Sequence, residues 1–363
     1  MKTKMLKINK STRSSIITVG MILIAYIICQ ALIATGNMSN LLQNLLVSMC
    51  YYSIMAVSLN LTVGILGQLS LGHAGFMCLG AFTGAIFSKC MVNTIEITFI
   101  RFTLAILLGA AVAGLFGIFI GTVVLRLRGD YLAIVTLAFG EIIKNVLNVL
   151  YIGYDSRGIH FSIKDAISLN LDEGGVVLVK GAQGISGAPR NATFTVGVVL
   201  LLITYLIIVN LVNSRSGRAI MAIRDNHIAA ESVGINITKY KILAFSISAA
   251  LAGVAGVLYS HNIATVQSSK FGYNLSIMIL VFVVLGGMGN LRGSIIAAVL
   301  LTLLPEYLRF LSDYRMLIYA IILIVMMLYN WSPACMAWRN KYSLKTLSDK
   351  ALSAVLKKSK KEV

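Results

Sequence analysis

Ten long apolar stretches dominate this sequence, and they restrict the chain to a membrane-embedded fold. An α-helix needs about 20 apolar residues to cross roughly 30 Å of hydrocarbon, and each stretch reaches or approaches that length. Only 12% of the residues are charged, whereas about a quarter are charged in a typical soluble domain. The sequence therefore predicts an all-α polytopic membrane protein with about ten transmembrane helices. Their approximate limits are 15–35, 41–66, 74–92, 102–125, 131–152, 193–213, 240–260, 274–290, 294–312 and 315–331.

The basic residues indicate how these spans are oriented. With both termini inside, 21 of the 31 Lys and Arg residues fall on the inner side, 9 fall outside, and Lys144 lies within a span. Cytoplasmic loops of membrane proteins carry such an excess, so the net charge of +18 requires no nucleic-acid partner. A basic tail also precedes a secretory signal peptide, but the first apolar core has about 20 residues against the usual 7–15. We therefore interpret it as a retained span.

This topology predicts one membrane domain with little aqueous mass. Residues 15–331 form the transmembrane domain, between a basic N-terminal tail, 1–14, and a basic C-terminal tail, 332–363. The longest outer gap, 153–192, and the longest inner segment, 214–239, are each too short to bury a sizeable core alone.

No constellation typical of an enzyme occurs in the sequence. It contains no GxxxxGK[ST] phosphate loop, no HExxH, no GxSxG and no CxxC pair. The five cysteines lie mostly in apolar runs, which favours packing thiols, and the four histidines are isolated from one another. We therefore expect that the chain is not an enzyme, binds no metal or cofactor, and hydrolyses no ATP by itself, so that another chain supplies any energy.

The inner segment 214–239 predicts two short helical pieces. Residues 216–224 fit one or two turns, after which Asp225 or Asn226 can cap a second helix that Gly234 can end. Two interpretations stay open on these grounds. The segment is either a slim docking element whose Arg218 and Arg224 form planar ion pairs with a partner, or an ordinary solvated basic loop.

Two glycine-rich breaks, 67–75 and 286–293, interrupt the apolar pattern between spans. Backbone that leaves a helix at membrane depth must be buried in protein or line a cavity. Either break can therefore expose polar groups to a substrate, and close helix packing through small residues is the alternative. The candidate pathway residues are Gln68, Ser70 and His73 in the first break and Gly286, Gly287, Gly289 and Asn290 in the second.

The fifth apolar stretch adds Thr136, Glu141 and Lys144 to the candidate pathway. A charge at the bilayer centre costs about 2.5–3.5 kcal/mol, so each ionised group needs a partner or water. Glu141 and Lys144, three residues apart, can pair on one helix face. A polar patch facing the pathway and a snorkelling Lys144 are the other two interpretations.

Five motifs in fixed order resemble the LivM-type permeases of branched-chain amino acid ABC importers. They read NLTVGILGQLSLGHAGF, GDYLAIVTLAFGEII, GISGAP, SGRAIMAIRDNHIAAESVG and LGGMGNLRG. They begin at residues 60, 129, 184, 216 and 285, and the fourth continues through Tyr259. The resemblance extends from about residue 45 to 330 and leaves out both tails.

This resemblance implies a multi-pass protein of the bacterial cell membrane with the fold of a type II importer permease. It also implies the partners: a second homologous permease subunit, two ATPase subunits that bind ATP and Mg, and an extracellular substrate-binding protein. Segment 216–234 then corresponds to the coupling segment that docks on the ATPase, although His227 stands where an acidic residue is common. The matching residues are Arg218, Arg224, Asp225, Asn226, Ala229, Ala230, Glu231 and Gly234. Arg224 and Glu231 are seven residues apart, close to two helical turns, so we expect their side chains to share one face.

Other functions remain as alternatives. Urea permeases and permeases for other amino acids are similar to this family. An ion-coupled secondary transporter usually places several ionisable residues within its spans, and here only Glu141 and Lys144 clearly qualify. A membrane enzyme lacks its catalytic constellation.

Overall fold

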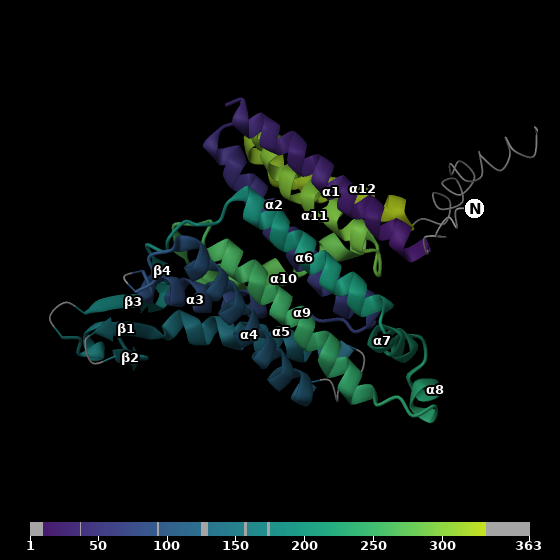
Figure 1. The fold of residues 1–363 in the computed structure, drawn as a ribbon, viewed down its shortest axis with the longest axis horizontal. Coiled ribbons are helices and arrows are strands. Elements are labelled where there is room, and N and C mark those ends of the chain that lie inside the picture. The colour runs from purple at the N-terminus through teal and green to yellow at the C-terminus, as the bar shows by residue number, and fades with distance from the viewer. Residues whose placement is uncertain are drawn as a thin grey trace, which may run out of the picture. The chain divides into compact units, whose positions relative to one another are not determined.

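A computed structural model describes residues 10–36, 38–92, 94–124, 130–155, 158–172 and 175–331 (Figure 1). The C-terminal tail 332–363, the first nine residues of the N-terminal tail, and the basic residues Arg126 and Arg128 lie outside this range. Each of the ten predicted spans coincides with a helix. These helices are α1 (Lys10–Ala34), α2 (Asn40–Asn60), α3 (His73–Cys90), α4 (Thr98–Val124), α5 (Asp130–Val149), α6 (Phe194–Asn213), α9 (Ile237–Ser260), α10 (Tyr273–Gly286), α11 (Leu291–Tyr307) and α12 (Arg315–Trp331).

Seven helices of the described chain are long and apolar enough to cross a membrane. A π-helical turn, Leu61–Ile65, extends α2. Two further helices, α7 (Arg215–Asp225) and α8 (His227–Ser232), occupy the inner segment.

The chain divides into two compact units. The first is Met1–Leu303, and the second, Leu304–Val363, contains the end of α11, a 3-10 segment Leu308–Tyr314, and α12. A single transmembrane domain over 15–331 stays a prediction.

Polar side chains at the first turns explain where several helices begin. The hydroxyl or amide oxygen of the residue before each helix accepts a hydrogen bond from a first-turn N–H, which otherwise has no intrahelical partner. The capping residues are Ser39 for α2, Thr193 for α6, Ser214 for α7, Asn226 for α8 and Asn236 for α9.

Small residues hold the core of the first unit together where α3, α4 and α9 cross. Gly80 of α3 faces the backbone of Gly253 in α9, and a Cβ added to Gly253 would lie 2.6 Å from the carbonyl oxygen of Gly109 in α4. Close backbone approach of this kind is how membrane helices gain packing energy when lipid is as apolar as their side chains. Beside them, α2 is mostly buried from Leu46 onward, with Ile54 and Met55 fully inaccessible.

The outer gap contains strands that the sequence did not predict. Strands β1 (Tyr151–Asp155), β2 (Gly158–Ser162) and β3 (Val176–Lys180) form an antiparallel sheet in the order β2-β1-β3. Strand β4 (Ile185–Ser186) pairs with β5 (Thr265–Val266), which follows α9. The all-α expectation therefore holds for the spans, whereas the outer gap forms a small β-structure.

The outer gap, 153–192, and the inner segment, 214–239, lie at opposite ends of the first unit. Figure 1 shows α7 and α8 at one end and β1–β3 at the other. The Nζ atom of Lys89, at the end of α3, donates to the carbonyl oxygen of Ser186 at 3.1 Å, so the outer sheets rest on the spans. This arrangement is compatible with the opposite sides that the distribution of basic residues predicts for 153–192 and 214–239.

Candidate functional site

Helix α7 packs one face against the membrane helices. Gly217, Ala219, Ile220 and Ile223 are buried, and a Cβ on Gly217 would overlap the carbonyl groups at the end of α6. Arg218 points to the exposed side, where its Nη1 donates to the carbonyl oxygen of Asn213 at 3.2 Å. With eleven residues, α7 is longer than the one or two turns that we predicted.

Helix α8 begins and ends as the sequence predicts. The side chain of Asn226 accepts from the N–H groups of Ile228 and Ala229, and Gly234 ends the helical stretch in the left-handed conformation at φ +84°. Ala230 is buried, whereas Ala229 and Glu231 are exposed. The side chain of Ile228 is also 69% exposed, so α8 offers an apolar group beside a carboxylate.

Arg224 and Glu231 do not share one helix face, contrary to the expectation from their seven-residue spacing. Asn226 has an extended backbone, with φ −157° and ψ 107°, which separates α7 from α8. The guanidinium of Arg224 forms an ion pair with Asp225 at 2.9 Å and donates through Nη1 to the carbonyl oxygen of Gly64 at 3.2 Å. Arg224 therefore faces the membrane helices as well as solvent.

The first break is closed by hydrogen bonds from neighbouring helices. The N–H of Leu71 donates to Oγ1 of Thr136 at 3.1 Å, and the N–H of Ala74 donates to Oγ of Ser276 at 3.2 Å. His73 is buried, and its Nε2 lies 2.8 Å from Oγ of Ser58. These groups at and just before the start of α3 are thus already hydrogen-bonded by α2, α5 and α10.

Two candidates in the first break have buried polar atoms without a hydrogen-bond partner among the described residues. Ser70 is 2% exposed, and its Oγ has no hydrogen-bond partner within the described chain. The same is true of Oε1 of Gln68. Of the residues predicted for this break, these two have the most unused hydrogen-bonding capacity that a polar substrate could engage.

Glu141 and Lys144 form the ion pair that their spacing predicts. Oε1 of Glu141 also accepts from the N–H of Tyr273 at 2.8 Å, at the start of α10. The two side chains retain only 24% and 22% of their exposure. This geometry favours a structural pair that joins α5 to α10.

The second break is a tight glycine turn between α10 and α11. Gly287 and Gly289 have φ values of +93° and +81°, which residues with a side chain rarely adopt. A Cβ on Gly286 would overlap the backbone of Gly293, so close packing explains that glycine. Asn290 accepts from the N–H of Gly293 at 3.3 Å and thereby begins α11.

A buried residue outside the predicted set connects the end of α2 to the second break. Asn60, at the end of α2, accepts from the N–H of Gly289 at 2.7 Å and donates to Oγ of Ser294 at 2.7 Å. Its sequence signals are its place at the start of the first motif and an amide within an apolar stretch, since a buried amide is costly unless it is hydrogen-bonded.

A cavity of about 510 Å³, lined by both polar and apolar side chains, lies where α7 meets the second break, and we call it the α7 cavity. Ile65, Met221, Arg224, Gly289 and Asn290 contribute to its wall. It thus joins residues from the inner segment, the end of the π-helical turn and the α10–α11 turn.

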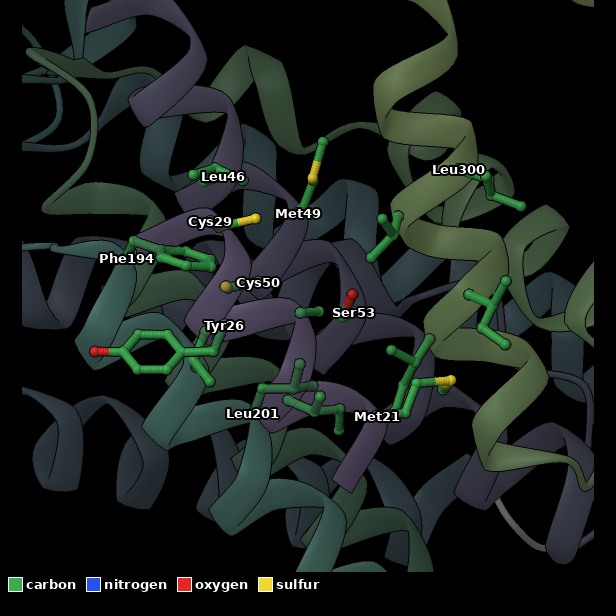
Figure 2. A pocket seen from close by; sticks show the side chains of 16 residues that line it. Met21, Tyr26, Cys29, Leu46, Met49, Cys50, Ser53, Phe194, Leu201 and Leu300 are labelled. Carbon is green, nitrogen blue, oxygen red and sulfur yellow. The ribbon is translucent and has the colours of Figure 1, made fainter. Parts of the chain in front are cut away.

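A second cavity, of about 270 Å³, is apolar (Figure 2). Met21 and Tyr26 of α1, Met49 of α2, Leu201 of α6 and Leu300 of α11 are among the side chains around it. None of its 16 lining residues is charged. This cavity therefore offers no ionic partner for the ammonium and carboxylate groups of an amino acid.

Comparison with known proteins agrees with the motifs. Residues 41–327 match the family described as the branched-chain amino acid transport system permease component. The chain belongs to this permease family. The match includes both breaks, the ion pair and helices α7 and α8.

Individual members of the permease family are also similar to the chain. It is 35% identical to the high-affinity branched-chain amino acid transport system permease protein LivM of Salmonella typhimurium, over 83% of this chain and 71% of that protein. The corresponding LivM protein of Escherichia coli is 34% identical, over 78% of this chain and 66% of its own length. The ribose import permease protein RbsC of Escherichia coli is 27% identical, over 85% and 92%. No solved structure matches the chain.

Proposed function

We propose that this chain is the membrane-spanning permease subunit of an ATP-binding-cassette importer for branched-chain amino acids. The observation that carries the proposal is the 34–35% identity to two LivM proteins over 78–83% of the chain. A sugar is the second candidate substrate, because the ribose permease is similar over a comparable share of the chain at 27% identity. The mutual pairing of Glu141 and Lys144 argues against an ion-coupled mechanism that would use these groups.

In this proposal the chain works with a second permease subunit, two ATPase subunits that bind ATP and Mg, and a substrate-binding protein outside. Helices α7 and α8 dock on an ATPase, with Ile228 and Glu231 on the exposed side. ATP binding and hydrolysis shift the complex between outward-open and inward-open states. Such a shift requires that ATP has different affinities for the two states.

Uptake of labelled substrates tests the transport function. We expect that cells lacking this gene lose import of leucine, isoleucine and valine, and that the restored gene returns it. Ribose and urea, measured in the same cells, are the matched controls. Restored uptake of ribose or urea without the three amino acids would contradict the proposed substrate.

The topology is tested by cysteine labelling in intact cells. In a background without the five native cysteines, Ile228→Cys in α8 should react with an impermeant reagent only after permeabilisation. Ile163→Cys in the outer gap is the matched control, because its side chain is 74% exposed and should react in intact cells. The reverse pattern would place 214–239 outside and overturn the predicted orientation.

A further inference from the structure

Helix α7 is tied directly to the end of α2. Nη1 of Arg224 donates to the carbonyl oxygen of Gly64, within the π-helical turn. The aliphatic part of the same side chain lies against Gly67, where a Cβ would be 2.5 Å from Cγ of Arg224. Gly67 has φ +75°, and the N–H of Gln68 closes the turn on the carbonyl oxygen of Thr62 at 2.9 Å. The end of α2 thus provides an acceptor and a side-chain-free surface for Arg224.

The same π-helical turn is tied to the second break. Asn60 is fully buried, and its amide makes two 2.7 Å hydrogen bonds, one to the N–H of Gly289 and one to Oγ of Ser294. A Cβ on Gly64 would overlap both the Asn60 amide and the N–H of Gly289. The helix end and the glycine turn therefore meet without a gap.

These contacts resist separation. An amide or N–H that loses its partner in a buried site leaves an unsatisfied group, which costs far more than an exposed bond. Because Gly64 has no side chain, no flexible group lies between Arg224 and Asn60 that could absorb a movement. The bond from Arg224 to Gly64 comes from a charged guanidinium, and the Asn60 bonds are buried. We therefore expect a displacement of α7 to carry the end of α2, and with it the α10–α11 turn.

We propose that Arg224 and Asn60 are positioning residues of one relay, which transmits the movement of α7 and α8 to the α10–α11 turn and so changes the shape of the α7 cavity. The relay rests on the proposed function. Ile65, Arg224 and Gly289 all line that cavity, so the three connected pieces form part of its wall. Neither residue touches ATP in this scheme, and their effect is on the coupling between ATP hydrolysis and import.

A double-mutant comparison in the assembled transporter tests the relay. Arg224→Met keeps the aliphatic stem against Gly67 and removes the donor to Gly64, and Asn60→Leu keeps the volume and removes both amide bonds. The quantity measured is the amount of leucine imported per ATP hydrolysed, in proteoliposomes that contain the full complex and its binding protein. Thr62→Val is the matched control, since among the described residues the hydroxyl of this buried side chain donates only to the carbonyl oxygen of Leu59, one turn earlier.

Each relay variant should lower this ratio about tenfold, which corresponds to losing the hydrogen bond of the charged Arg224 guanidinium or those of the buried Asn60 amide. If the two sites act independently, the double variant should lower the ratio about a hundredfold. If they are two links of one relay, the double variant should lower it only about tenfold, as each single variant does. A hundredfold loss, or wild-type ratios in both single variants, would overturn the relay. If Asn60→Leu fails to fold, Ser294→Ala, which removes one hydroxyl, replaces it in the same comparison. Absence of import by the wild-type complex would instead contradict the proposed function.

Discussion

Replacement of Gly253 by leucine should prevent α3, α4 and α9 from packing, with a loss of more than about 3 kcal/mol in the free energy of unfolding. A Cβ at this position would lie 2.6 Å from Cβ of Ala113 and 2.6 Å from the carbonyl oxygen of Gly109. Carbon atoms in ordinary contact are about 3.5–4.0 Å apart. Gly80 presents its own backbone on another side, so the helices would have to move apart.

Thermal unfolding of the purified protein in detergent measures this effect. Gly20→Leu is the matched control, because Gly20 lies in α1 and a Cβ there would meet no described atom within 4 Å. The control should unfold near the wild-type temperature, and Gly253→Leu should aggregate or unfold far below it. Equal stability of the two variants would show that α3, α4 and α9 do not approach this closely.

Replacement of Glu141 by alanine should destabilise the protein by about 2 kcal/mol, since it leaves the charge of Lys144 without a partner inside a span. The variant also removes the acceptor for the N–H of Tyr273. The combined variant Glu141→Gln with Lys144→Met removes both charges and keeps an acceptor. It should therefore regain most of the lost stability.

The ion pair Glu306–Arg309 provides an internal control. It has the same spacing, but the side chains are 30% and 62% exposed, so Glu306→Ala should cost less than about 1 kcal/mol. Equal losses for Glu141→Ala and Glu306→Ala would contradict a stabilising role of the pair within the span. Leucine uptake by the uncharged double variant then decides between the remaining interpretations: normal uptake indicates a structural pair, and lost uptake of a stable protein indicates a polar patch on the pathway.

The helical framework was accessible from sequence because it depends on local rules. A run of about 20 apolar residues can satisfy its backbone in lipid only as a helix, and each such run became one. The limits of α8 followed equally from two residues, since Asn226 accepts from first-turn N–H groups and Gly234 adopts a left-handed conformation without strain.

Contacts between distant segments were not accessible in the same way. Asn60 bonds to residues 229 and 234 positions further along the chain, and no local pattern specifies such partners. The prediction that Arg224 and Glu231 share one helix face was wrong because it assumed one continuous helix through Asn226. The strands of the outer gap were missed because five-residue strands in a polar loop carry little periodic signal.

The shortness of α10 has a consequence for how the protein is made. Its 14 residues extend about 21 Å, well below the roughly 30 Å of hydrocarbon, and the glycine turn that follows must be covered by protein. Its contacts include Glu141 of α5 at Tyr273, Ala74 of α3 at Ser276, and the ring of Tyr52 in α2 at Phe282. All three helices precede α10 in the chain, and synthesis proceeds from the N-terminus. The segment least able to enter lipid alone therefore leaves the ribosome after the helices that shelter it.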